Sequence, residues 1–356
     1  MPPGWAYTAA LAGLAYMSWD RLTALLSHTS PEQAWARVCD GGAGPAWARA
    51  AAATSVEAVA EAHVQAGVRV SCRGEPGYPA MLTDDHEAPP VLFSIGRLEA
   101  LARPRVGMVG TRRATGYGRD VARELGRDLA EAGVTVVSGL AAGIDGASHQ
   151  GALDGASAPP VAVVGSGLDV TYPRRHAALW RQVGEAGAVL SEAPLGARPE
   201  AWRFPARNRL IAALSQVLVV VESHRSGGSF HTVRAAAERA VPVMAVPGPV
   251  RSPASAGTNR LLGEGCAPAC DAADVLVALS LETSGPSPPA DRRLPPVGEE
   301  AVVLEAVGWE ATRTDQVLTR TGLAPSRVMM ALTRLEAAGW VRPAAGQAGW
   351  WERAAR

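Results

Sequence analysis

Three short apolar runs each lead into a glycine-rich loop, and all three lie between residues 106 and 173. They are VGMVGTRRATGYG, VTVVSGLAAGID and VAVVGSGLDVTYP. In an open parallel sheet, loops at the carboxyl ends of the strands converge on one crevice, where glycine lets backbone amides approach a phosphate. The first loop also carries two adjacent arginines, Arg112 and Arg113. The pattern therefore predicts a parallel sheet with a site for a polyanion.

Strand-like and helix-like segments alternate through this region and beyond it. The expected strands are Val106–Val109, Val134–Ser138, Val161–Val164, Val189–Ser191, Val217–Val221 and Val243–Val246, separated by helices over 118–132, 143–151, 175–186, 208–213 and 232–239. This alternation is typical of an α/β fold with an extended Rossmann-like, doubly wound parallel sheet. Upstream, Val91–Ile95 is expected to form an edge strand.

Two smaller units are expected on either side of the sheet domain, which we place at residues 68–280. Residues 1–67 predict a small helical domain, with helices over 5–17, 19–26 and 31–38 and with Ser30 as a cap. Residues 281–297 are rich in proline and serine and predict a linker. Residues 298–356 predict a winged-helix domain, with helices over 299–307, 312–321 and 325–338 and a β-hairpin around AAGQAG.

The charge of the chain is unevenly distributed. The formal net charge is zero, but residues 103–280 hold 19 arginines against 15 acidic residues. Lysine is absent, so each basic side chain that meets an anion can use the planar, bidentate geometry of arginine. The middle segment is therefore the expected place for anion binding.

Cysteine usage and hydropathy argue against disulfide-rich, metal-binding, membrane and secreted proteins. The four cysteines are scattered, and no second pair of Cys or His lies near Cys266 and Cys270, so neither disulfides nor a metal are expected. No apolar stretch has the length of a membrane span, and residues 1–20 lack a secretory signal. We therefore expect a cytoplasmic protein without a membrane partner.

Cofactor binding is the usual role of a glycine-rich strand end, but the residues argue against it. Gly165 and Gly167 supply two glycines of a dinucleotide motif, but Val170 stands at the third position. A P-loop needs a lysine, and neither VVSGL nor VVGSGL forms the GxSxG elbow of a serine hydrolase. Asp145 and His149 share a helix face, which could indicate an acid–base or metal pair. The favoured interpretation is structural: Asp145 caps the start of the helix and His149 bonds nearby backbone. No cofactor is expected.

A second arginine cluster lies in WRFPARNRLIAALS. We expect Arg207, Asn208 and Arg209 at a helix start, where they would face Arg112 across the crevice with free backbone N–H groups. Trp202 and Phe204 precede them, and aromatic faces among arginines suit single-stranded nucleic acid. A core position for Phe204 with solvated arginines is the equal alternative. Downstream, Ser229 or Thr232 is expected to cap a helix, with or without an anion bound there.

These segments, together with LSEAPLG and VMAVPGPVRSPASAGTNRLLGEG, occur in an order that resembles the DNA-processing protein A (DprA, also called Smf) family from about residue 78 to residue 278. The resemblance implies a dimeric, non-enzymatic protein that binds single-stranded DNA, protects incoming DNA during natural transformation and loads RecA recombinase. It also implies DNA contacts by residues in the matching motifs: Arg112, Gly165, Ser166, Gly167, Leu168, Arg174, Arg207, Asn208 and Arg209.

The sequence departs from the family pattern in three places. The N-terminal helices carry AGLAYMSWD in place of a GxG hairpin, so no DNA contact is predicted there. RSGGSFHTV contains an extra glycine, which changes one wall of the expected site. The winged helix is charge-neutral, so a partner or a structural role is as well supported as duplex DNA.

Two alternatives come from other functional classes. SGGSFHTVRAAAE loosely resembles the PGGxGTxxE motif of nucleoside-monophosphate phosphoribohydrolases, whose chemistry would use Glu222 or Glu238 as acid or base. Here Ser226 and His231 replace the proline and a glycine of that motif. The second alternative is a winged-helix regulator with a nucleotide-sensing Rossmann domain. Only Arg327 and Arg334 lie on its recognition helix, which disfavours duplex readout.

Overall fold

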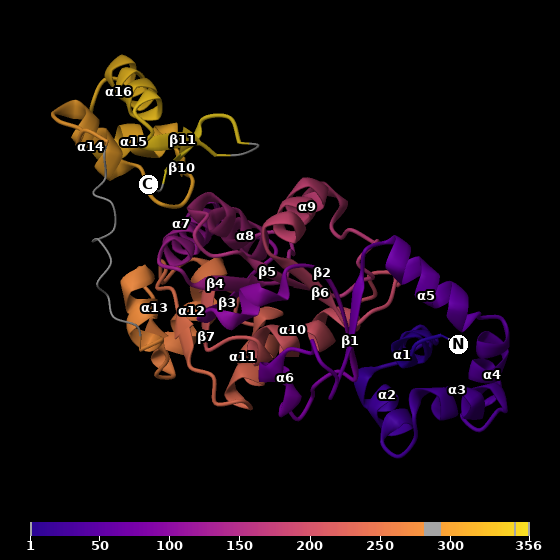
Figure 1. The fold of residues 1–356 in the computed structure, drawn as a ribbon. Helices are drawn as coiled ribbons and strands as arrows, with labels where there is room; N and C mark the ends of the chain where they lie inside the picture. The colour runs from indigo at the N-terminus through magenta and orange to yellow at the C-terminus, as the bar shows by residue number, and fades with distance from the viewer. Residues whose placement is uncertain (1, 281–292, 345–346, 355–356) are drawn as a thin grey trace.

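A nine-stranded sheet runs through the centre of the computed structural model, which describes residues 2–280, 293–344 and 347–354. The strand order is β1-β2-β6-β5-β4-β3-β7-β8-β9. The strands β1 to β7 are labelled in Figure 1. The parallel strands are β3 (Arg105–Gly110), β4 (Thr135–Ser138), β5 (Val161–Val164), β6 (Ala188–Ser191), β7 (Val217–Glu222), β8 (Val243–Ala245) and β9 (Ala267–Pro268). The expected doubly wound α/β fold is confirmed.

Helices cover both faces of the sheet because alternate residues of each strand point to opposite sides. In β7, Val217, Val219 and Val221 pack on one face, whereas Leu218 and Val220 pack on the other. The first face is covered by α7 (Gly116–Glu131), α8 (Ile144–Gly155) and α13 (Ala272–Ala278). The second is covered by α6 (Ala80–Thr83), α10 (Arg203–Ala213), α11 (Ser229–Ala237) and α12 (Ala256–Gly263). The helix α9 (Ala177–Ala186) packs near β2 and β6, and η1 (Leu98–Ala102), η2 (Arg174–His176) and η3 (Pro253–Ser255) are short 3₁₀ turns.

The contact between α7 and α8 depends on glycine. A Cβ at Gly126 would collide with the carbonyl oxygen of Ser148, and one at Gly151 would collide with that of Arg123. The two helices therefore approach at backbone distance, which fixes the loop in front of each helix relative to the other.

The expected edge position of Val91–Ile95 is wrong. The strand β2 (Val91–Gly96) is internal, because it pairs antiparallel with β6 on one side and with β1 (Arg69–Cys72) on the other. The edge strand on this side of the sheet is β1, whose four residues RVSC are too short a run to stand out in the sequence pattern.

The N-terminal segment forms five helices, which lie together beyond β1 and β2 (Figure 1). Their cores, Leu11 among them, join Val91, Phe93 and Val164 of the sheet in one apolar cluster. The expected cap is confirmed, since the Ser30 hydroxyl accepts the Gln33 N–H and the Gln33 side chain accepts the Ser30 N–H. The helices are α1 (Gly4–Ala12), α2 (Trp19–Leu26), α3 (Pro31–Cys39), α4 (Pro45–Ala52) and α5 (Val56–Gln65).

The C-terminal segment is a winged helix with one strand more than expected. The extra strand β10 (Thr312–Arg313) pairs with β12 (Trp350–Arg353), which also pairs with β11 (Val341–Pro343). The helices are α14 (Glu299–Ala306), α15 (Thr314–Thr321) and α16 (Pro325–Ala337). Residues 281–292 of the expected linker and residues 345–346 of the AAGQAG loop lie outside the described residues.

The winged helix contacts the sheet domain at α7. Arg342 on β11 forms an ion pair of 2.7 Å with Asp120, and the centroids of the Tyr117 and Trp309 rings lie 5.9 Å apart.

Across the described ranges, no helix combines the length and hydropathy needed to cross a bilayer.

Candidate functional site

The main crevice lies where the order of the strands reverses. The chain builds β4, β5 and β6 on one side of β3 and then places β7 on its other side. The loops after β3 and β7 therefore diverge, which is where doubly wound sheets bind ligands. A crevice of about 720 Å³ opens there, lined by Arg112 and Arg113 from the first loop and by Gly227, Gly228 and Ser229 from the second.

An aromatic pair holds Arg112 on the wall of this crevice. The guanidinium carbon of Arg112 lies 4.5 Å from the centroid of the Phe204 ring, and the centroid of the Tyr172 ring lies 5.4 Å from that of Phe204. All three residues line the crevice. Phe204 is half-buried rather than part of the core, so of the two interpretations left open the structure favours an aromatic surface among arginines.

Arg207, Asn208 and Arg209 do not lie at a helix start. The helix α10 begins at Arg203, so these residues occupy its second turn and offer no free backbone N–H groups. The expected start at residue 208 is wrong because Pro205 stands in the first turn, where the missing N–H of proline costs no hydrogen bond. Asn208 and Arg207 both line the crevice.

Arg207 is a buried cation at the back of the crevice. Its Nη1 donates to the carbonyl oxygen of Val163, and its guanidinium packs so closely on Gly139 that a Cβ there would collide with it. Burial lowers the pKa of Arg207 to about 10, against which the nearby charge of Asp145 acts. The Nε–H of Arg207 is buried and has no acceptor within the described ranges.

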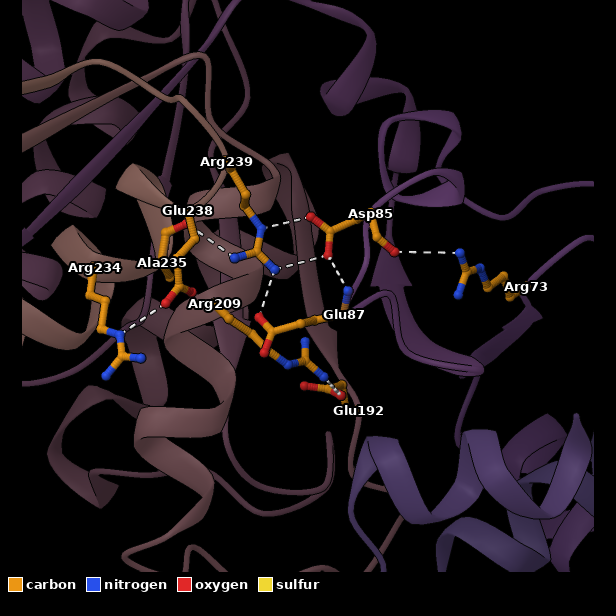
Figure 2. A network of polar contacts seen from close by, with 9 residues as sticks. All are labelled: Arg73, Asp85, Glu87, Glu192, Arg209, Arg234, Ala235, Glu238 and Arg239. Carbon is orange, nitrogen blue, oxygen red and sulfur yellow. Dashed lines mark hydrogen bonds and ion pairs between the residues drawn. The ribbon is translucent and has the colours of Figure 1, made fainter.

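Arg209 points away from Arg207 because residues two apart on a helix face different directions. It forms an ion pair with Glu192, as Figure 2 shows, and its guanidinium carbon lies 5.0 Å from the centroid of the Trp19 ring. It does not line the crevice. The expected convergence of Arg209 with Arg112 is therefore wrong.

The loop after β5 borders a smaller cavity of about 160 Å³ beside the crevice. Gly165 and Ser166 line it together with Arg112, Arg207 and other crevice residues, so the two spaces adjoin. The Gly167 N–H donates to the carbonyl oxygen of Ala197 at 2.9 Å, and Leu168 is buried in the core. Only the first half of the expected loop faces this cavity.

Two functional candidates beyond the expected set lie in TYPRRH. Arg175 lines the smaller cavity, and Tyr172 lines both cavities. Arg174 is exposed on η2 and lines neither of them, and its DNA contact stays a prediction. The sequence shows Arg175 directly after Arg174, so it could have been considered as a candidate. The family resemblance indicated Arg174 only.

Asp145 and His149 have structural surroundings. Gly143 is the N-cap of α8, so the expectation that Asp145 caps this helix is wrong; Asp145 is buried and burial raises its pKa. The histidine bonds backbone as expected: Nδ1 lies 3.1 Å from the Asp145 carbonyl oxygen and Nε2 lies 3.1 Å from that of Val161, and the neutral ring donates to one of the two. Burial lowers the pKa of His149 to about 3, so the ring is neutral at pH 7.

The expected hydroxyl cap of α11 is also wrong. Gly228 is the N-cap, and no side chain caps the helix. Ser229 contacts the Ser223 hydroxyl at 2.7 Å, and Thr232 Oγ1 is buried without a partner in the part of the chain that the structure describes. Both residues line the crevice, but the Ser229 hydroxyl is already hydrogen-bonded and the Thr232 hydroxyl is buried.

The carboxylates that a phosphoribohydrolase would use lie elsewhere. Glu222 accepts the backbone N–H of Thr115 at 2.8 Å and its hydroxyl at 2.7 Å, which anchors the start of α7. Glu238 is paired with Arg234 at 2.9 Å. Neither lines the crevice or the smaller cavity, where Asp145 is the one carboxylate among the described lining residues.

A group of potential metal ligands lies outside the crevice. His86, Glu87 and Glu238 bring their ligand atoms within 4.8 Å of one another. Arg239 already binds Glu87 at 2.8 Å, and Arg234 binds Glu238, as Figure 2 shows. These ion pairs supply the positive charge that a metal would otherwise bring.

Comparison with known proteins gives matches over most of the chain. A family model described as DNA recombination-mediator protein A matches residues 69–280, and a DprA winged helix domain matches residues 286–347. A putative DNA processing protein DprA from Mycobacterium tuberculosis is 41% identical over 258 residues, which are 71% of this chain and 66% of that protein. The match thus spans just under two thirds of that relative's length.

Two solved structures resemble a large part of the fold. DNA processing protein A from Streptococcus pneumoniae aligns with a TM-score of 0.62 and 27% identity, covering 78% of this chain and 98% of that one. DNA processing protein A from Helicobacter pylori, described with its single-stranded DNA binding mode, aligns with a TM-score of 0.52 and 29% identity. That alignment covers 60% of this chain and 95% of the other.

Proposed function

Because this chain belongs to the DNA recombination-mediator protein A family, we propose that it binds single-stranded DNA in the crevice between the loops after β3 and β7. The observation that carries the proposal is the wall on which Arg112 lies against Phe204, whose ring also lies beside Tyr172, with the buried Arg207 lining the same crevice. A single strand needs cations for its phosphates and aromatic faces for its bases, and this wall offers both.

The exposed arginines and the buried Arg207 have different roles in the proposed site. Arg112, Arg113 and Arg175 are exposed and reach the solvent side, where they meet phosphates without regard to sequence. Arg207 adds a fixed positive charge at the back, where its guanidinium is held by the Val163 carbonyl oxygen. Gly165, Ser166, Gly167, Leu168, Arg174, Asn208 and Arg209 remain part of the proposed binding region, the buried members as supports of its walls.

The protein acts by binding and not by chemistry. The crevice and the smaller cavity hold one carboxylate among their described lining residues, Asp145, whose burial opposes its ionisation. Its charge offsets that of Arg207, which leaves it no free role as a base. As a mediator, the protein protects incoming single strands during transformation and loads RecA on them. Two copies form a dimer in which their crevices make one continuous binding surface for the strand.

The winged helix has a different role from the crevice. On α16, Arg327 is paired with Glu299, and Arg334 lies 3.4 Å from Glu300. Because α14 supplies these acidic partners, the recognition helix has little free positive charge for duplex DNA.

A salt titration of binding to single-stranded and duplex oligonucleotides of equal length tests the proposal. We expect single strands to bind more tightly and the affinity to fall steeply with salt. Equal affinity for both forms, or no binding to either, would contradict it. Adding RecA to the preformed complex then tests loading, for which we expect faster filament growth than on naked DNA.

A further inference from the structure

A separate pocket of about 130 Å³ lies between the N-terminal helices and the carboxyl ends of β5 and β6. Trp19 and Leu22 line it from α2, Glu192 from the end of β6 and Trp202 from the residue before α10. Gly165 and Arg207 line both this pocket and the smaller cavity beside the DNA crevice. The pocket therefore adjoins the region in which we propose that the strand lies.

Two indole rings form part of the pocket wall, and each has a cation against it. The guanidinium carbon of Arg203 lies 4.4 Å from the centroid of the Trp202 ring, and that of Arg209 lies 5.0 Å from the centroid of Trp19. The indole N–H of Trp202 donates to Glu200 at 2.8 Å. Trp202 is 36% exposed, so the pocket wall reaches the surface at this ring.

Among the described residues that line the pocket, Glu192 is the one with a carboxylate. Figure 2 shows this carboxylate meeting the Arg209 guanidinium, and the side chain of Glu192 keeps 21% of its surface exposed. A carboxylate has about four lone pairs, of which this ion pair uses a part. The neighbouring Ser191 hydroxyl donates to the Ser166 carbonyl oxygen at 2.8 Å and is already used.

The shape and charge of the pocket select its ligand. An apolar cavity of roughly 150 Å³ holds one benzene-sized ring, so a pocket of about 130 Å³ suits a single six-membered ring. Arg203 and Arg207 also line the pocket, but Arg203 lies against Trp202 and pairs with Glu200, and Arg207 donates to the Val163 carbonyl oxygen. A phosphate would therefore meet the Glu192 carboxylate beside cations that already have partners. A carboxylate instead accepts from an amino group such as N4 of cytosine, whereas thymine presents carbonyl oxygens on both sides of its one N–H.

We propose that this pocket takes one pyrimidine base, cytosine in preference to thymine, turned out from the single strand in the crevice. The ring lies between apolar and indole walls, and its amino group donates to Glu192. The inference rests on the proposed function, because it needs a strand in the crevice. It assigns to the N-terminal domain a DNA contact that the sequence did not predict.

Homopolymers of deoxycytidine, deoxythymidine and deoxyadenosine of equal length, bound to the full chain at one salt concentration, test this inference. We expect the cytidine oligomer to bind about fivefold to tenfold more tightly than the adenosine oligomer, in line with the loss of one stacked base. Trp19→Ala should remove this preference by removing the stacking wall. Glu192→Gln should bring the affinities for cytidine and thymidine oligomers together, because an amide both donates and accepts.

Tyr16 precedes Trp19 by three residues, is exposed and does not line the pocket, so Tyr16→Ala is the matched control and should keep the preference. Thermal melting of each variant separates loss of the pocket from loss of the fold, and Trp19→Ala leaves the Glu192–Arg209 pair intact. Equal binding of all homopolymers by the unaltered chain would overturn the proposed base pocket but leave the proposed DNA site in the crevice standing. A preference for cytidine that survives in both Trp19→Ala and Glu192→Gln would have the same consequence. Absence of binding to every single strand would overturn the proposed function as well.

Discussion

Arg112 lies with its guanidinium carbon 4.5 Å from the centroid of Phe204, on a ring that also contacts Tyr172. The aromatic ring restricts an otherwise exposed side chain, so less conformational entropy is lost when Arg112 binds a phosphate. The cation and the stacking surface therefore act as one unit.

Replacing Phe204 tests that unit. Phe204→Leu keeps an apolar side chain on the wall but removes the aromatic face for both Arg112 and a base. We expect the Kd for single-stranded DNA to rise about fivefold to tenfold, as measured by fluorescence anisotropy. Phe204→Trp is the control that keeps an aromatic face, and a loss as large as that of the leucine variant would contradict the stacking role.

Arg112→Ala should weaken binding to all sequences alike, because a phosphate contact carries no sequence information. The slope of log K against log salt should shrink by about 0.7, the value for one phosphate contact on a single strand. Arg123→Ala is the matched control, since Arg123 is an exposed arginine on α7 that pairs with Asp154 away from the crevice. An unchanged slope in Arg112→Ala would remove Arg112 from the phosphate contacts.

Arg174 and Arg175 make a second comparison between adjacent residues. Arg175 lines the cavity beside the crevice and Arg174 does not, so Arg175→Ala should raise the Kd for single strands severalfold and more than Arg174→Ala does. The two variants have equal charge, so a general electrostatic effect would weaken binding equally. A larger effect of Arg174→Ala would support the position that family resemblance indicated.

The sequence predicted the sheet and the crevice because both follow from local patterns. Runs such as VLVVV can only be buried on two faces, and loops at the ends of such strands must meet. The direction of side chains on α10 was less predictable. It depends on whether the helix starts before or after Pro205, and that choice decides that Arg207 faces the crevice while Arg209 faces Glu192. The pocket at Trp19 was beyond prediction, because its walls come from segments more than a hundred residues apart that only tertiary packing joins.

His149 predicts a pH dependence of stability. Its pKa is about 3 in the folded chain and 6.5 in the unfolded one, so the unfolded state binds more protons between these values. Stability from this group is fully present above pH 6.5 and is lost as the pH falls toward 3. Urea denaturation at pH 7.5, 6.5 and 5.5 should show a shallower decline in His149→Gln than in the unaltered chain. The buried Asp145 is present in both proteins, so their difference reports on His149; identical profiles would contradict the assignment.

Gly139 limits where Arg207 can lie, and an alanine there tests how firmly. The new Cβ would collide with the Arg207 guanidinium, which is held by the Val163 carbonyl oxygen, so Gly139→Ala should destabilise the fold by about 1–3 kcal/mol. Arg207→Leu removes the colliding group but leaves Asp145 without its cation, which is costly by itself. Because one contact causes the clash, the double variant should lose at least about 1 kcal/mol less than the sum of the single variants. Additive losses in urea denaturation would show that Arg207 has room to move, and the fixed charge at the back of the crevice would then have to be abandoned.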